Sequence, residues 1–123
     1  DAYNASPMSM EASLSTLHQA TVSKGKRAIA VLGDMLELGH VAVAAHRKVG
    51  QQAAEAGVSC VITLGEMGRE IAAGAKEAGL KQVYACDTHQ QAADRLKALL
   101  KPGDTVLFKG SRGMAMEKII DLI

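Results

Sequence analysis

The sequence has very few aromatic side chains, since tryptophan is absent and aromatic residues make up 2% of its 123 positions. Platforms on which nucleic-acid bases or sugars stack are therefore scarce. Neither sign of charge is in excess, because the formal net charge is +1, so there is no electrostatic case for nucleic acid or for a polybasic membrane contact. No apolar run approaches the roughly 20 residues that a membrane-spanning helix needs. We therefore expect neither nucleic acid nor a membrane as a partner.

Cysteine is also rare, and both cysteines, Cys60 and Cys86, lie within apolar runs. A disulfide between them would require adjacent strands, and we do not expect one. Two buried thiols in a sequence without a signal peptide are typical of reduced core residues in a cytoplasmic protein. The chain starts at Asp1, without an initiator methionine, in a polar and turn-forming stretch. This start indicates a piece of a longer protein.

Residues 28–32 form an unbroken apolar run that ends at Gly33. The run is too short for a helix and too uniformly apolar for a strand with one exposed face, so it predicts a strand buried on both faces. Asp34 follows where this strand should end. Because ligands of open α/β sheets bind just beyond the carboxyl ends of the strands, we expect Asp34 at the edge of a cleft.

Three further apolar runs alternate with helical patterns. We expect strands at residues 58–64, 82–86 and 105–108. Apolar residues at intervals of three or four mark five helix faces: Met10, Leu14, Leu17 and Thr21; Val41, Ala45, Val49, Ala53 and Ala56; Met67, Ile71, Ala75 and Ala78; Ala92, Leu96 and Leu99; and Met116, Ile119, Ile120 and Ile123.

The connections between these elements are only a few residues long. Ser6 and Pro7 predict the start of the first helix, and Asp87 or Thr88 can cap the helix that follows the third strand. Strict alternation of strands and helices predicts one Rossmann-like α/β domain over residues 1–123, with a mostly parallel sheet covered by helices on both faces. A hydrophobic content of 48% is enough to build its core.

Glycine-rich phosphate signatures are missing from every predicted strand end. Neither G-x-G-x-x-G nor G-x-x-x-x-G-K-[ST] occurs, so the chain has no self-sufficient phosphate cradle. Residues 109–113 (KGSRG) instead lead from the last strand into a predicted helix start. Lysine, hydroxyl, guanidinium and free N–H groups there would bind an anion, either a carboxylate or a phosphate. The alternative is a tight turn at Gly110 and Gly113 with Lys109 and Arg112 solvated.

Other ionisable residues have two interpretations each. Asp34 and Glu37 fit a general acid/base pair or a magnesium site, or else Asp34 caps the turn that follows it and Glu37 is merely exposed. Glu66 and Asp87 follow predicted strands but also fit helix N-termini, where carboxylates are favoured. The histidines have no metal-ligand spacing with either cysteine, and His46, in mid-helix, is typical of a hydrogen-bonded structural residue.

Three motifs occur together in a recognisable order and spacing. They are residues 1–10 (DAYNASPMSM), residues 30–39 (AVLGDMLELG) with His46 beyond, and residues 109–112 (KGSR). This combination closely resembles the C-terminal domain of the Mur ligases, in the branch that adds D-alanyl-D-alanine to UDP-N-acetylmuramoyl-tripeptide. The resemblance spans essentially the whole chain. One departure is Ser6, where the family usually has asparagine, and serine caps a helix as well.

The resemblance implies a ligase of three domains, of which the first binds the UDP-sugar, the central one carries the ATP phosphate loop, and the third corresponds to this chain. ATP would phosphorylate the tripeptide carboxylate, and the amine of D-alanyl-D-alanine would then attack the acyl phosphate. This reaction would belong to peptidoglycan synthesis, and so to cell-wall biogenesis, cell shape and cell division. Mg²⁺ would be held mainly by the central domain, and the third domain alone would be inactive.

The resemblance also implies roles for particular residues, although it assigns no catalytic residue to this domain. Asp1 would hydrogen-bond the ATP ribose, and Asn4 would lie nearby, towards the phosphates. The dipeptide site would comprise Lys109, Ser111 and Arg112, flanked by Asp34 and Glu37. Which of the two cations contacts the dipeptide carboxylate stays open.

Two other functions are compatible with the sequence. One is a stand-alone Rossmann-like module that binds an anion or a partner protein. The other is the same domain of a related amino-acid-adding ligase, such as a folate polyglutamate ligase. The stretch around Asn4 and the Gly33-Asp34-Met35 sequence favour the D-alanyl-D-alanine branch over these relatives.

Overall fold

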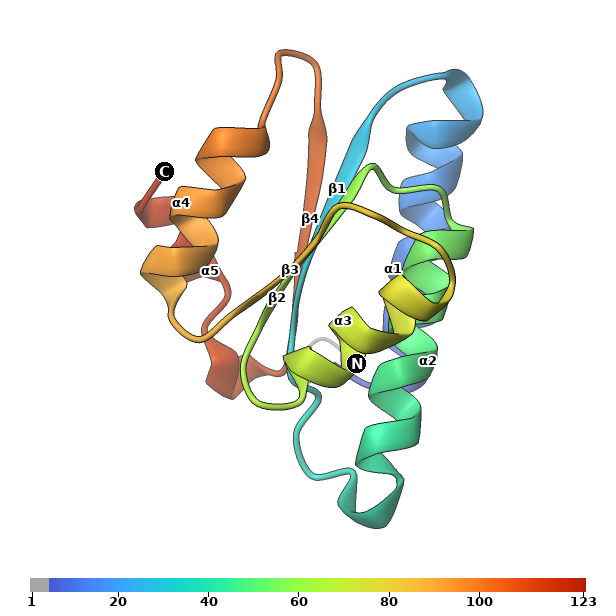
Figure 1. The fold of residues 1–123 in the computed structure, drawn as a ribbon, viewed down its shortest axis with the longest axis vertical. Helices are drawn as coiled ribbons and strands as arrows, with labels where there is room; N and C mark the ends of the chain where they lie inside the picture. The colour runs from blue at the N-terminus through green and yellow to red at the C-terminus, as the bar shows by residue number, and fades with distance from the viewer. Residues whose placement is uncertain (1–4) are drawn as a thin grey trace.

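The computed structural model describes residues 5–123, which form a single sheet between two layers of helices (Figure 1). The strands are β1 (Ala28–Gly33), β2 (Cys60–Leu64), β3 (Val83–Cys86) and β4 (Thr105–Lys109). The α-helices are α1 (Pro7–Ala20), α2 (Ala42–Glu55), α3 (Gly68–Glu77), α4 (His89–Leu99) and α5 (Glu117–Asp121). Short 3₁₀ helices are η1 (Val22–Lys24), η2 (Gly39–Val41) and η3 (Arg112–Met114). No helix within residues 5–123 combines the length and the apolar character needed to cross a membrane.

Local capping explains where two of the helices begin. The Ser6 hydroxyl accepts a hydrogen bond from the Ser9 N–H, and the Ser9 hydroxyl accepts one from the Ser6 N–H, with Pro7 at the first helical position. At α4 the Thr88 hydroxyl accepts from the Gln91 N–H at 3.1 Å. Both predicted helix starts are confirmed, and Thr88 rather than Asp87 is the cap of α4.

Strand β1 lies at the centre of the molecule and is buried along its whole length, as predicted. Its side chains alternate between the two faces of the sheet. Ala28, Ala30 and Leu32 join the core under α1, α2 and α3, whereas Ile29 and Val31 join the core under α4 and α5. Figure 1 shows these two helix layers on opposite sides of the sheet. The structure thus confirms the predicted Rossmann-like, three-layer α/β fold.

The strands run parallel in the order β3-β2-β1-β4. From β1 the chain moves outward through β2 to β3, then returns over the other face through α4 and places β4 on the opposite side of β1. The strand order therefore reverses between β1 and β4. In open α/β sheets such a reversal opens a crevice at the carboxyl ends of the two strands, where ligands bind.

The elements differ from the predictions mainly at their ends. β2 and β3 begin two residues and one residue later than expected, and β4 continues to Lys109. In the last helix, Met116 and Ile119 are buried as expected, but Ile120 and Ile123 are 51% and 49% exposed, so their predicted place in the core is wrong. Because α5 spans only five residues, it buries a single short stripe.

Both cysteines are buried and free, on the neighbouring strands β2 and β3. The register sets Cys86 opposite Leu64 rather than opposite Cys60. The Cα atoms of the two cysteines are thus offset by about 13 Å along the strand direction, at about 3.3 Å per residue, which is too far for a disulfide. Burial raises the pKa of both thiols, so they are core residues of low reactivity.

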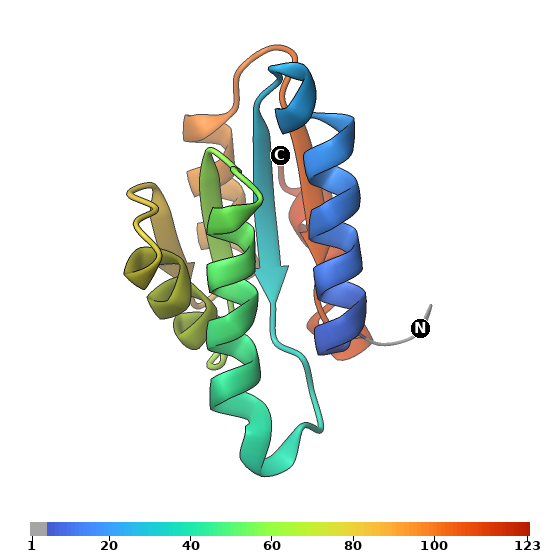
Figure 2. The ribbon, with the colours of Figure 1, turned by 90° about the vertical axis from the view of Figure 1, so that its right-hand side faces the viewer.

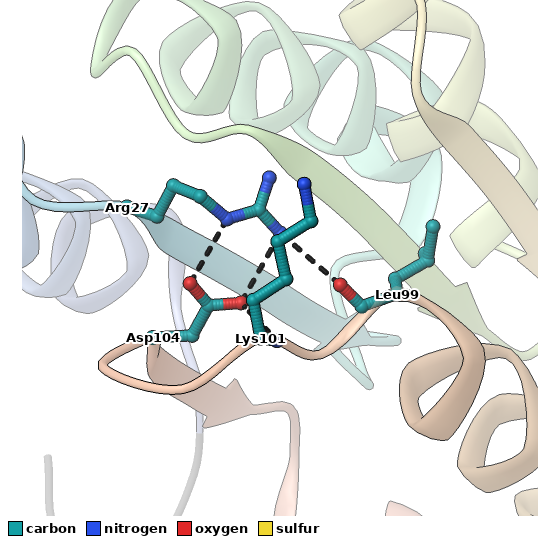
Figure 3. Close-up of polar contacts among 4 residues, drawn as sticks. All are labelled: Arg27, Leu99, Lys101 and Asp104. Carbon is teal, nitrogen blue, oxygen red and sulfur yellow. Dashed lines mark hydrogen bonds and ion pairs between the residues drawn. The ribbon is translucent and has the colours of Figure 1, made fainter.

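An ion pair closes the amino end of the sheet (Figure 3). The Arg27 guanidinium donates to Asp104 through Nε at 2.9 Å and Nη2 at 3.1 Å, and Nη2 also donates to the Leu99 carbonyl oxygen at 3.2 Å. The Asp104 carboxylate additionally accepts from the Lys101 N–H at 2.9 Å. The hydrogen bond from Arg27 lowers the pKa of Asp104. These contacts join the residue before β1 to the residue before β4.

Candidate functional site at the carboxyl ends of β1 and β4

The candidate site lies where β1 and β4 end side by side. Leu32 of β1 is paired with Lys109 of β4, so the loops after the two strands emerge together. The two backbones approach each other closely here. A Cβ atom on Gly110 would lie only 3.1 Å from the Cα of Gly33. The two motifs, far apart in the sequence, are therefore neighbours at the point where the strand order reverses.

Asp34 joins three segments at this edge of the sheet. Its backbone oxygen accepts from the Ser111 N–H at 2.8 Å, which fixes the loop after β4. Its side chain is almost fully buried, and Oδ1 accepts from the N–H of Gly68, the first residue of α3, also at 2.8 Å. Gly65 leaves room for the carboxylate, since a Cβ there would lie 2.5 Å from Oδ1. A carboxylate at a helix N-terminus complements the helix dipole.

This geometry corrects one of the two interpretations of Asp34. The carboxylate does not cap the turn that follows it in sequence, because it caps α3 instead. Other side chains bind the amides of that turn: His46 Nε2 accepts from the Met35 N–H at 2.9 Å, and Ser111 Oγ accepts from the Leu36 N–H at 2.7 Å. The loop after β1 is thus fixed by partners from α2 and from the loop after β4.

His46 is a fully buried structural histidine, as the sequence predicts. Its Nδ1 lies 2.6 Å from the Ala42 carbonyl oxygen, and a carbonyl only accepts, so Nδ1 carries the proton. Nε2 accepts from the Met35 N–H and therefore carries none. The two contacts together require the neutral ring in one tautomer.

The loop after β4 places its polar groups unequally. Ser111 is 1% exposed, and its hydroxyl faces the chain rather than solvent, whereas Arg112 is exposed and Lys109 is half-buried. The helix start that the sequence predicts at residues 109–113 is only the three-residue η3. This loop therefore offers cationic side chains but no helix N-terminus of useful length. Glu37 is exposed on the neighbouring loop, at a φ of 64°.

The remaining candidates lie elsewhere. Asp1 and Asn4 fall outside the described residues. Asp87 is paired with Arg69 at 2.7 Å beyond the end of β3, and Glu66 is exposed before α3. Within residues 5–123, no three His, Cys, Asp or Glu side chains lie close enough together to hold a metal ion.

Two contributors to this edge were not singled out from the sequence. Gly68 supplies the amide that binds Asp34, and Leu36 lies exposed between the two loops, with its Cδ1 3.2 Å from the position of a Cβ on Gly113. The sequence does not set Leu36 apart, because Met35 and Leu38 in the same loop are also apolar. No local signal identifies Gly68, because its role depends on strand order.

Comparison with known proteins decides the family. The model for "Mur ligase, glutamate ligase domain" matches residues 1–112. The chain belongs to the Mur ligase family. This confirms the resemblance drawn from the three sequence motifs.

Individual relatives place the chain more narrowly. It is 40% identical to the UDP-N-acetylmuramoyl-tripeptide–D-alanyl-D-alanine ligase of Bacillus subtilis and 36% identical to that of Mycobacterium tuberculosis. Both alignments cover 100% of this chain but only 27% and 28% of the respective relatives. The chain thus spans about a quarter of the length of the curated relatives that it matches.

Solved structures agree with this placement. The MurF ligase of Thermotoga maritima, crystallised in complex with ADP, is 26% identical with a TM-score of 0.78. A crystal structure of MurF from Acinetobacter baumannii is 30% identical with a TM-score of 0.80. Each match covers 98% of this chain and 26% of the other. The match therefore involves the whole fold of this chain and one part of each ligase.

Proposed function

We propose that this chain is the C-terminal domain of an ATP-dependent ligase that adds D-alanyl-D-alanine to UDP-N-acetylmuramoyl-tripeptide in peptidoglycan precursor synthesis. The observation that carries the proposal is the position of the KGSR motif, which begins at the last residue of β4 and lies beside Asp34 at the reversal of strand order. Its support from sequence is the alignment of the whole chain with ligases of that name.

The reaction joins a carboxylate to an amine and consumes ATP. The tripeptide carboxylate takes the γ-phosphoryl group and releases ADP, and the dipeptide amine then attacks the acyl carbon and releases phosphate. The dipeptide amine must therefore point towards the acyl phosphate, whereas its carboxylate must be held elsewhere. A charge-assisted contact at the carboxylate end orients the dipeptide for this attack.

We assign the carboxylate contact to Lys109, the last residue of β4, and to Arg112, the first residue of η3. Ser111 is too deeply buried to face a ligand directly, so we assign it the role of fixing the loop through Leu36. Asp34 and Glu37 flank the same crevice from the loop after β1. Of these two carboxylates, Glu37 is exposed and can face the dipeptide, whereas the Asp34 carboxylate is buried against Gly68 and supports the site through the loops that it joins.

Contacts with ATP involve parts of the chain that the described residues do not include. We assign the ribose to Asp1 and the phosphate side to Asn4, on the strength of the family motif. We assign Mg²⁺ mainly to the central domain, because the resemblance to the Mur ligases implies that the phosphate machinery lies there. The free, buried thiols of Cys60 and Cys86 fit a reducing compartment, and we place the reaction in the cytoplasm.

A ligation assay on the full-length protein tests this proposal. Purified protein is given ATP, UDP-N-acetylmuramoyl-tripeptide and D-alanyl-D-alanine, and the product is identified by mass. We expect ADP release that requires both other substrates, and no ATP turnover by residues 1–123 alone. Product from a different amino acid but not from D-alanyl-D-alanine would indicate a related amino-acid-adding ligase. No product with any amine would favour a binding module instead.

A further inference from the structure

Leu36 is a large apolar residue that stays exposed beside the cationic loop. It is 41% exposed, on the segment between β1 and α2 that extends beyond the end of the sheet (Figure 2). Single exposed leucines are common and need no explanation by themselves. The position of this one is different, because its Cδ1 lies 3.2 Å from the site of a Cβ on Gly113, within the loop that also carries Lys109 and Arg112.

The backbone that leads to Leu36 is held at three consecutive residues, 34, 35 and 36. The Asp34 oxygen accepts from the Ser111 N–H, the Met35 N–H donates to His46, and the Leu36 N–H donates to Ser111 Oγ at 2.7 Å. The Met35 side chain is buried in the core, whereas the next side chain, Leu36, stays exposed. Buried partners fix this segment, and a residue on such a segment meets a ligand with little further loss of conformational freedom.

We propose that Leu36 is a specificity-determining residue that contacts the methyl group of the C-terminal alanine of the incoming dipeptide. This inference rests on the proposed function, and in particular on the carboxylate contact at Lys109 and Arg112. The methyl group and the carboxylate of that alanine are carried by the same Cα atom. An apolar side chain that packs on the cationic loop is therefore next to the methyl group when the carboxylate is bound.

This contact gives the ligase a way to prefer alanine over glycine at the C-terminal position of the dipeptide. A single methyl group in an apolar pocket discriminates by about tenfold or more. Leu36 supplies the apolar surface without adding a polar group that would remain unpaired. Glycine at Gly113 keeps the space above the loop open for the leucine side chain.

The test pairs a protein substitution with removal of a methyl group from the dipeptide. Full-length wild-type and Leu36→Ala ligase are assayed with D-alanyl-D-alanine, glycyl-D-alanine, D-alanyl-glycine and glycylglycine, as substrates or as competitors. We expect Leu36→Ala to lower kcat/KM about tenfold for the two dipeptides that end in D-alanine and less than about twofold for the two that end in glycine. The matched control is Val43→Ala, another exposed apolar residue, at 46%, which should leave the preference unchanged.

The outcomes separate this inference from the proposed function. An equal effect of Leu36→Ala on all four dipeptides, no effect on any, or a dependence on the N-terminal methyl group would overturn the role of Leu36. Failure of the wild-type enzyme to use D-alanyl-D-alanine would overturn the proposed function itself. Because Leu36 is exposed, its truncation leaves the core intact, and amide spectra of the variant check this directly.

Discussion

The two ends of the sheet are held together in different ways. At the amino end, Arg27 and Asp104 form a two-pronged ion pair that joins the approaches to β1 and β4. At the carboxyl end, the corresponding loops are joined by backbone amides together with the Asp34 carboxylate, the Ser111 hydroxyl and the neutral His46 ring. A charged pair thus joins the two strands at the amino end, whereas amides, a carboxylate, a hydroxyl and an imidazole contribute the hydrogen bonds described for the loops at the carboxyl end.

The two ends of the sheet should respond differently to the solution conditions. An ion pair weakens when the carboxylate is protonated or when salt screens it, and Arg27 is partly exposed. Apart from the Asp34 carboxylate, the hydrogen bonds at the carboxyl end join uncharged groups, whose contacts do not depend on salt in this way. We therefore expect added salt to loosen the amino end before it loosens the loops at the carboxyl end.

The largest effect on stability is expected from His46→Phe. Phenylalanine fills a similar volume but leaves the buried Met35 N–H without its acceptor, and a buried unpaired group costs about 1–3 kcal/mol. Urea unfolding of the 123-residue chain at pH 7 should show a loss of about 2–3 kcal/mol. His46→Gln keeps a hydrogen-bond acceptor and should therefore lose less stability than His46→Phe. A loss below about 0.5 kcal/mol would mean that His46 does not hold the loop.

The next effect is expected from Asp104→Asn, and it should depend on pH. Because Arg27 lowers the pKa of Asp104 in the folded state, the carboxylate stabilises the fold above its unfolded pKa of about 3.9, and this contribution is lost as the pH falls through the lower folded value. At pH 7 we expect the variant to be less stable by about 1–2 kcal/mol.

Repeating this comparison in acid tests whether the Arg27–Asp104 ion pair stabilises the amino end of the sheet. Unfolding of wild type and Asp104→Asn is compared at pH 7 and again at pH 3, where other carboxyl groups titrate equally in both proteins. The difference in the free energy of unfolding between wild type and Asp104→Asn should be smaller at pH 3 than at pH 7. A difference in stability that stays constant or increases at pH 3 would show that folding does not lower the pKa of Asp104.

The smallest effect is expected from Ser111→Ala, which removes one neutral hydrogen bond to the Leu36 N–H. We expect a loss of about 1 kcal/mol and faster hydrogen exchange at the Leu36 amide, with little change at the amino end. Ser15→Ala, on the exposed face of α1, is the matched control. Unchanged exchange at Leu36 would contradict the assignment of Ser111 to loop positioning.

Much of the fold could be predicted because its signals are local. The apolar run of β1 needs only the burial of its own side chains, and the helix start at Ser6 needs only Ser9, three residues away. The last helix was less predictable, because Ile119 is buried whereas Ile120, next to it in α5, and Ile123, beyond the end of α5, are exposed. Periodicity identifies a helical face but not the length over which something covers it.

The site was predictable in its residues but not in its connections. The hydrogen bond from Gly68 to Asp34 spans 34 residues, and the bond from Leu36 to Ser111 spans 75. Both depend on the order β3-β2-β1-β4, which short alternating elements do not determine by themselves. The family motifs indicated that these segments meet, and the structure supplies the atoms through which they do.

Matched substitutions of cations at the two ends of the sheet test whether the carboxyl end of β4 binds the dipeptide. In the full-length ligase, Arg112→Ala removes a cation at the carboxyl end, and Lys101→Ala removes the side chain of a lysine at the amino end. Loss of a charge-assisted contact costs about 1.5–3 kcal/mol, so Arg112→Ala should raise the KM for D-alanyl-D-alanine by roughly ten- to a hundredfold with little change in the KM for ATP. Lys101→Ala should change neither. Equal KM values for the dipeptide in wild type and Arg112→Ala would show that the carboxyl end of β4 does not bind the dipeptide. An equal rise in this KM with Lys101→Ala would show the same.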